Sequence, residues 1–343
     1  MPGACLSSFL PSRWSATLAW FALATNLSGG CAVDRAPEAG PKSSGGGGLG
    51  DSPAETTARP PRSPTAVLPS AAPASASAAV EERPQRPPWA PPPDGKRGIT
   101  KDFDYDAAEL KDKSRRYTGR TFVHRVAYES RGKLPLIVFF HGLNRALIPH
   151  RWMGGGTEGD VREIASDLFD KGLIAPAILA GPGSIQKDAV SFGASFPTFD
   201  FDGFVDLVVA NLDPGLPIDR EKIVVLGHSG AGCSEKGGIV TALRSKHPIH
   251  AVVSIDTCMP GSLAAALSAA PSKTNVVVTW QTATWEREFP HFRKVFESGV
   301  AKAPADPGVL RELDQLPNLP RSHDATVKQT FDKWLPRLLP GGA

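Results

Sequence analysis

IVVLGHSGAG, residues 223–232, is the stretch that decides the expected fold. Its β-branched apolar residues predict a buried strand, and a helix-compatible stretch follows the glycines. A serine at such a sharp turn takes a strained backbone conformation, so its neighbours two residues away, Gly227 and Ala231, must be small. Such a turn would raise the hydroxyl of Ser229 above the edge of the sheet, with the N–H of Gly230 beside it. No Lys-Ser or Lys-Thr pair follows the glycines, so the pattern does not indicate a phosphate-binding P-loop.

The composition excludes a strongly charged class of protein. The 343 residues carry 38 Lys and Arg against 35 Asp and Glu, and this near-neutral balance gives no electrostatic basis for binding nucleic acid. A His-Glu-x-x-His motif and the Cys/His spacings suited to zinc are absent from the sequence. We therefore expect no metal and no other cofactor.

The first 30 residues resemble an export signal. Arg13 supplies a positive charge, and residues 14–27 are mostly apolar but too short to span a membrane comfortably. Small residues then precede Cys31, as in the processing box of bacterial lipoproteins, although Leu27 stands four residues before the cysteine rather than three. We expect export and anchoring to the bacterial envelope by a lipid on Cys31. There are two alternatives. The signal could be cleaved near Cys31 to give a periplasmic or secreted protein, or it could remain uncleaved as an anchor.

Residues 31–97 have the composition of a tether. They are rich in Pro, Ala, Ser and Gly, and 14 of the 33 prolines of the chain lie in residues 32–97. Such a segment buries too little apolar surface to offset the entropy lost on ordering. A flexible coil of this length reaches roughly 45 Å. The sequence predicts a disordered tether in front of one domain at 98–343; disorder without an anchor is the alternative.

Strands and helices are expected to alternate in this domain. We expect strands at residues 120–129, 134–140, 175–180, 222–226, 251–255, 275–280 and 309–313. Apolar residues at helical spacing predict helices at 160–171 and 201–212, and a final helix that carries Val327, Phe331 and Trp334 and ends at Pro336. This alternation is typical of an α/β fold with a mostly parallel sheet and helices on both faces.

The turn around Ser229 resembles the nucleophile elbow of the α/β-hydrolase family. One position departs from the usual G-x-S-x-G pattern, because the last glycine is replaced by Ala231. The resemblance covers most of residues 98–343 and implies an α/β-hydrolase fold, with little or no lid over the site. His228, next to the serine, is expected to line or support the elbow.

A second motif of the family lies at the end of another expected strand. His141, Gly142 and Leu143 directly follow the apolar run 134–140, where the family has part of its oxyanion loop. The resemblance implies that the N–H of Leu143 is the second oxyanion donor beside that of Gly230. Gly142 would allow the tight turn, and His141 would orient the loop.

A serine hydroxyl needs a base at neutral pH. His323 lies in the polar stretch 320–324 before the final helix, which is where the family places its catalytic histidine. We therefore expect His323 to be the base, with His291 as the competitor. The remaining histidines are interpreted as surface or packing residues.

Three carboxylates are candidates for the acid that orients the base. Most of the family place it after the strand that here is 275–280, where the following loop offers Glu286 and Glu288 but no aspartate. Asp256, at the end of the preceding strand, is the alternative placement of some lipases and is our first choice. Asp256 would otherwise serve as a helix cap.

Two cysteines remain for the domain. Cys233 lies one helical turn beyond Ser229, and Cys258 lies two residues beyond Asp256 on the strand expected beside the elbow strand. In an exported protein this pair is expected to form a disulfide that ties the elbow to the acid-bearing loop. Two buried free thiols are the alternative.

These residues together predict a serine hydrolase of carboxylic esters that works through a Ser-His-acid triad and an acyl-enzyme. The expected partner is a small-molecule or polymeric ester, with membrane contact only through the lipidated N-terminus. An amidase or peptidase acting on cell-wall or peptide material, and a binding lipoprotein without activity, are the alternatives. The sequence does not give the oligomeric state.

Overall fold

The structure is a computed structural model, and it describes residues 96–105, 117–184, 195–197, 199–212 and 216–342. The expected signal at 1–30, Cys31 and nearly all of the tether at 31–97 lie outside the described residues. The first described strand begins at Gly98.

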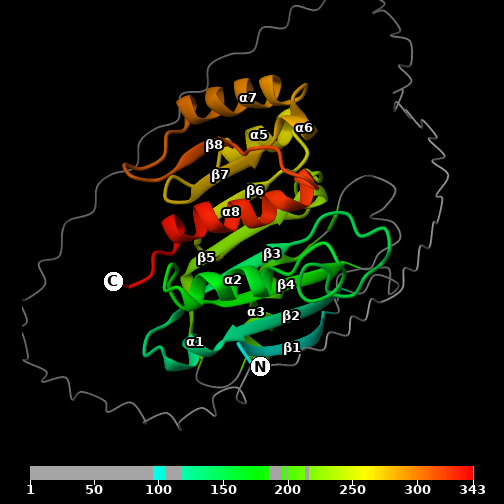
Figure 1. Cartoon of the computed structure of the whole chain (residues 1–343). Coiled ribbons are helices and arrows are strands. Elements are labelled where there is room, and N and C mark those ends of the chain that lie inside the picture. The colour runs from blue at the N-terminus through cyan, green and yellow to red at the C-terminus, as the bar shows by residue number, and fades with distance from the viewer. Residues whose placement is uncertain (1–95, 106–116, 185–194, 198, 213–215, 343) are drawn as a thin grey trace, which may run out of the picture. The chain divides into compact units, whose positions relative to one another are not determined.

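The described residues form an eight-stranded sheet with the order β1-β2-β4-β3-β5-β6-β7-β8 (Figure 1). The strands are β1 Gly98–Tyr105, β2 Tyr117–His124, β3 Leu134–Phe140, β4 Ile178–Ser184, β5 Ile218–His228, β6 Ile249–Ile255, β7 Asn275–Trp280 and β8 Arg311–Gln315. β1 and β2 are antiparallel to their neighbours, and β4, β3, β5, β6, β7 and β8 run parallel. The mostly parallel sheet expected from the sequence is confirmed.

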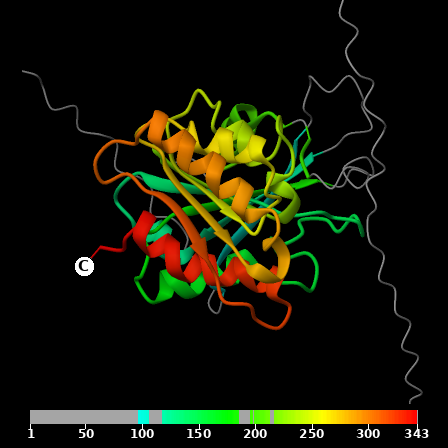
Figure 2. The ribbon, with the colours of Figure 1, turned by 90° about the horizontal axis from the view of Figure 1, so that it is seen from above.

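Helices cover both faces of this sheet. They are α1 Arg125–Glu129, α2 Val161–Asp170, α3 Phe201–Asn211, α4 Ile239–Ala242, α5 Gly261–Ser268, α6 Thr282–Trp285, α7 Phe289–Lys302 and α8 Ser322–Leu338, with a short 3-10 turn η2 at Ser229–Gly232. Viewed along the layers, α2 and α8 lie on one face, and α5 and α7 lie on the other (Figure 2).

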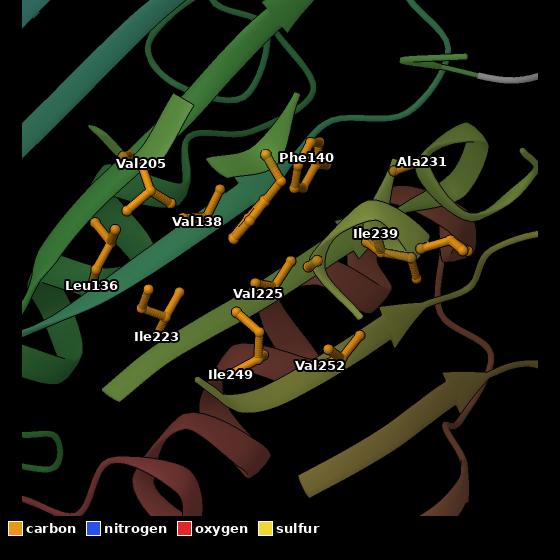
Figure 3. Packing of buried hydrophobic residues seen from close by; sticks show 14 of the residues in the cluster. Leu136, Val138, Phe140, Val205, Ile223, Val225, Ala231, Ile239, Ile249 and Val252 are labelled. Atoms are coloured by element: carbon orange, nitrogen blue, oxygen red, sulfur yellow. The ribbon is translucent and has the colours of Figure 1, made fainter. Parts of the chain in front are cut away.

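Alternate residues of the central strands point to opposite faces of the sheet and pack into two buried cores. Leu136 and Val138 of β3 point to the face of α3, α5 and α7, where Val205, Ile223 and Val225 join them (Figure 3). Ile137 and Phe139 of the same strand point to the face of α2 and α8. A strand buried on both faces explains why 134–140 is apolar at every position.

Three expectations about element boundaries were wrong. The strand expected at 120–129 ends at His124, because Nδ1 of His124 caps the short helix α1 by accepting a bond of 3.5 Å from Val126 N–H. The last helix does not end at Pro336, since buried Leu335 and Leu338 hold its final turn against the sheet. The same helix begins at Ser322, so His323 lies in its first turn rather than in a loop.

The stretch after Ser229 also differs from expectation. It forms only the 3-10 turn η2 and continues without regular structure until the four-residue helix α4. The four glycines in residues 230–238 explain this, because glycine loses the most backbone entropy in a helix. Strand β1 and helix α7 were not foreseen at all.

The parallel register decides where functional residues meet. Phe140 of β3 pairs with Gly227 of β5, and His228 of β5 pairs with Ile255 of β6. The residues that follow these three strands therefore leave the sheet at one edge. These residues are His141, Ser229 and Asp256.

We expect Leu136→Ala to lower the free energy of unfolding by about 2–5 kcal/mol, because Leu136 is fully buried and its loss leaves a cavity. Leu319→Ala is the matched control, since this leucine is 45% exposed and should change stability by less than about 0.5 kcal/mol. Chemical denaturation of both variants measures the difference. Equal losses in the two variants would contradict the core assignment.

Candidate active site

The backbone at Ser229 has the strained geometry expected of the elbow. Its φ is +54°, in the left-handed region that residues other than glycine rarely adopt. Close packing explains the glycines around it. A Cβ on Gly227 would lie 2.1 Å from Cγ2 of Ile239, and a Cβ on Gly142 would lie 2.6 Å from Cβ of Ser229. The loop that contains Gly142 therefore packs directly against the serine.

Asp256 is held by a set of donors at the end of β6. It is completely buried, and its φ of +45° turns the chain away from the strand. One carboxylate oxygen accepts bonds of 2.8 Å from Nε2 of Gln281 and 3.1 Å from Oγ1 of Thr284. The backbone N–H of Gln281 reaches the other oxygen at 3.3 Å. A buried carboxylate with this many donors has a fixed orientation.

His323 meets this carboxylate. Its Nδ1 lies 2.6 Å from Oδ2 of Asp256, although the two residues are 67 positions apart in the chain. The competing residues are elsewhere: His291 is exposed on α7, and Glu286 and Glu288 are exposed beside α6. Of the candidates left open by the sequence, the structure brings together His323 and Asp256.

Ser229 and His323 open into one pocket of about 330 Å³. Gly142 and Leu143 of the oxyanion loop line the same pocket. Gly230 follows the serine in η2 and is buried. The pocket thus borders the serine, the histidine and the loop whose N–H groups were expected to bind an oxyanion.

Charged side chains also line this pocket, and the sequence interpretation missed them. Arg151 pairs with Glu158 at 3.0 Å, Arg145 is exposed, and Asp324 follows His323 on α8. Burial raises the pKa of the Asp324 carboxyl. No motif marks these residues, because loop 145–158 reaches the pocket only through the fold.

Gln281 and Thr284, which hold Asp256, were missed as well. A signal did exist, because both directly follow the strand 275–280, whose carboxyl end lies at the functional edge. The loop was interpreted only as a source of a carboxylate, whereas its amide and hydroxyl groups orient the carboxylate of Asp256.

His141 is a buried, neutral histidine. Its Nδ1 lies 2.6 Å from the carbonyl oxygen of Gly142, and its ring lies 4.9 Å from that of Phe196. Burial lowers the pKa of His141 to about 4. A carbonyl can only accept, so the neutral ring carries its proton on Nδ1 and donates to Gly142. This bond ties the side chain of His141 to the loop that follows β3.

His228 contacts His323 as well as the turn at Ser229. Its Nε2 lies 3.0 Å from the backbone oxygen of His323, and the two imidazole rings are 4.6 Å apart. Burial, and then the nearby His323, lower the pKa of His228 well below its ordinary value. His228 is therefore neutral at physiological pH.

The expected disulfide is present. Cys233 and Cys258 are bonded, with their Cα atoms 5.0 Å apart. Cys233 closes η2, which begins at Ser229, and Cys258 follows Asp256 by two residues. The bond thus links the serine-bearing turn to the carboxylate-bearing turn.

Among the described residues, no group of three or more His, Cys, Asp or Glu side chains is placed to hold a metal ion. Within those same ranges, no helix is long and apolar enough to cross a membrane.

Comparison with known proteins finds no matching protein-family model and no matching curated sequence. Solved structures do match. The feruloyl esterase module from Clostridium thermocellum, complexed with sinapinate, superposes with a TM-score of 0.50 at 11% identity over 71% of this chain and 88% of its own. The chain has the α/β-hydrolase fold.

Two further structures are similar at a lower score. A ferulic acid esterase has a TM-score of 0.49 and 13% identity over 71% of this chain and 98% of its own. An S-formylglutathione hydrolase from Agrobacterium tumefaciens has a TM-score of 0.46 and 14% identity over 71% of this chain and 96% of its own. At these identities the likeness shows the fold alone, so the chemistry rests on the site.

We expect the folded protein to lose stability as the pH falls from 7 to 5, partly through His141. The unfolded chain binds a proton at this residue near pH 6.5, whereas the folded state binds it only near pH 4. Stability therefore falls with pH through this window, by about 2 kcal/mol between pH 6.5 and 5 for His141. Urea denaturation across this range should give a shallower pH dependence for His141→Gln. The same slope in both proteins would contradict the assignment.

Proposed function

We propose that the protein is a serine hydrolase of carboxylic esters, with Ser229 as nucleophile, His323 as base and Asp256 as acid. The observation that carries the proposal is the 2.6 Å contact between Nδ1 of His323 and the buried carboxylate of Asp256, beside a pocket that contains the strained Ser229. Nucleophile, base and orienting carboxylate are recognised by such geometry rather than by sequence position.

The proton arrangement supports this assignment of roles. When Nδ1–H of His323 donates to Asp256, the other ring nitrogen carries the free lone pair that a base needs. That nitrogen takes the proton of the Ser229 hydroxyl as Oγ bonds to the ester carbonyl carbon. Asp256 then stabilises the imidazolium that forms.

The oxyanion is assigned to backbone donors. As Ser229 attacks, the electron pair of the carbonyl moves to its oxygen, which the N–H groups of Leu143 and Gly230 bind. The alcohol leaves with the proton from His323, and an acyl-serine remains. Water, activated by the same histidine, then attacks the acyl-serine, releases the carboxylic acid and restores the serine.

Ester hydrolysis is favoured over amide hydrolysis because an alcohol departs more easily than an amine. The structural likeness to the feruloyl esterase module from Clostridium thermocellum is consistent with this choice. The charged lining of the pocket favours a polar ester, small or carried on a polymer.

We expect a fluorophosphonate probe to label the purified protein at Ser229, because only an activated serine reacts with it. Ser229→Ala should abolish labelling and ester turnover, and His323→Ala should lower kcat by about 10⁶-fold. Asp256→Asn should lower kcat by about 10⁴-fold, because it disturbs the tautomer of the base. Mass spectrometry of the labelled peptide and p-nitrophenyl acetate hydrolysis measure these effects.

Two matched variants control this experiment. Ser234→Ala removes another hydroxyl five positions along the same segment, and Glu286→Gln removes the alternative acid; both should keep label and turnover. A folded wild-type protein that takes no label would overturn the proposal. Turnover of amides in preference to matched esters would assign the site to an amidase.

We further propose that the protein is exported and anchored through Cys31. The disulfide between Cys233 and Cys258 supports export, because such bonds persist in oxidising compartments. Cells that express the full chain should incorporate labelled palmitate into it, and Cys31→Ser should abolish incorporation. Cys5→Ser is the control and should retain the lipid. If the wild-type protein is found in the periplasm and carries no lipid, the proposed anchor is contradicted but export is not.

A further inference from the structure

His228 is a buried titratable group that the proposed reaction does not use. It is 2% exposed, and it stands between the last apolar residues of β5 and Ser229. Burying an imidazole costs free energy unless its polar atoms find partners. Its Nδ1 has no partner among the described residues, so this position is not one that favours histidine for stability alone.

The partner of Nε2 indicates what the residue does. Because a backbone carbonyl only accepts, the bond of 3.0 Å means that the neutral His228 carries its proton on Nε2 and donates to the oxygen of His323. The ring of His228 also lies 4.6 Å from the ring of His323, with 37° between their planes. His228 therefore contacts both the backbone and the ring of the proposed base.

Few other contacts hold the first turn of α8 to the sheet. The residue before it, Arg321, has a left-handed backbone and gives no side-chain cap to the helix. Oγ1 of Thr326 also donates to the His323 oxygen, at 2.7 Å, but Thr326 belongs to the same helix and fixes nothing to the sheet. Among the described residues, His228 links the His323 backbone to β5, and Asp256 links the His323 ring to β6.

We propose that His228 is a positioning residue that sets the distance and orientation of His323 relative to Ser229. The inference rests on the proposed function for its kinetic consequence. His228 precedes Ser229 in the chain, so its bond ties the base directly to the strand that carries the nucleophile. Two anchors, one on the ring and one on the backbone, then fix the imidazole before the substrate arrives.

The test compares two substitutions of His228 in the full chain. His228→Phe keeps a planar ring but removes the donor, and His228→Gln replaces the ring with an amide that can donate to the same carbonyl. We expect His228→Phe to lower kcat about 10²-fold, the loss typical of a misplaced catalytic group, with KM changed by less than about threefold. His228→Gln should restore most of the lost kcat.

The chain offers a matched control at the other end of the same helix. Nε2 of His250 lies 3.0 Å from the backbone oxygen of Leu338, the last residue of α8. His250→Phe therefore removes an equivalent bond to α8, far from the pocket, and should leave kcat unchanged. If His228→Phe, His228→Gln and His250→Phe all lower kcat alike, the role is structural and the inference is overturned. Unchanged kcat in His228→Phe overturns it as well.

A second measurement does not depend on turnover. In a Ser229→Ala background, the proton NMR spectrum of protein with ¹⁵N-labelled histidine should show a strongly deshielded Nδ1 proton for His323. The reason is that Nδ1–H of His323 donates a hydrogen bond to Asp256. We expect His228→Phe to broaden or abolish the signal and His228→Gln to restore it. An unchanged signal in His228→Phe would overturn the inference. Loss of the signal in a protein whose wild type hydrolyses no ester would support the positioning role and reject the proposed function.

Discussion

The left-handed backbone of Ser229, with a φ of +54°, is the constraint on which the rest of the site depends. Such a conformation costs on the order of 1–3 kcal/mol in a residue other than glycine, and it persists only where the surroundings impose it. The surroundings do so from three sides. Gly142 packs against the serine, Gly227 packs against Ile239, and the oxygen of Gly230 accepts a bond of 2.8 Å from the N–H of Ser195. The disulfide from Cys233 then fixes the end of the turn.

The proposed base, His323, comes from a different part of the chain and is placed by the docking of α8. Oγ1 of Thr330 lies 2.8 Å from Oγ1 of Thr279 on β7, and Nε1 of Trp334 donates to Asp314 on β8 at 2.7 Å. These contacts fix the axis of the helix over the sheet. With the axis fixed, the first turn carries His323 to the carboxyl edge, where it meets Asp256 from β6.

Local patterns predicted elements well wherever one physical cause dominated. The run 134–140 is apolar at every position because both faces of β3 are buried, and the structure agrees with the sequence to the residue. Predictions failed where tertiary contacts overrode local preference. Pro336 is tolerated inside α8 because its buried neighbours hold the last turn, and residues 125–129 leave the strand because His124 caps a helix.

In the candidate site, too, local patterns predicted some residues and tertiary contacts decided others. The glycines around Ser229 and the pair His141-Gly142 were found from the sequence, since tight backbone approach demands those residue types within a short segment. His323 was expected as the base from the resemblance to the α/β-hydrolase family, although it lies in the first turn of the last helix rather than before it. The bond from His228 to His323 carries no sequence signature. Gln281 and Thr284 had one weak signal, their place after the strand 275–280, but any polar residue near a strand end has the same appearance.

The sequence by itself therefore determined the order of the motifs along the chain: an apolar strand, the His141-Gly142 loop, the turn at Ser229 and a histidine near the last helix. It also supplied the two cysteines and narrowed the acid to three carboxylates. Only the tertiary structure decided that Asp256 rather than Glu286 meets His323. The physical reason is that parallel pairing aligns the ends of β3, β5 and β6 at one edge, and distances between residues far apart in the chain are set by that register alone.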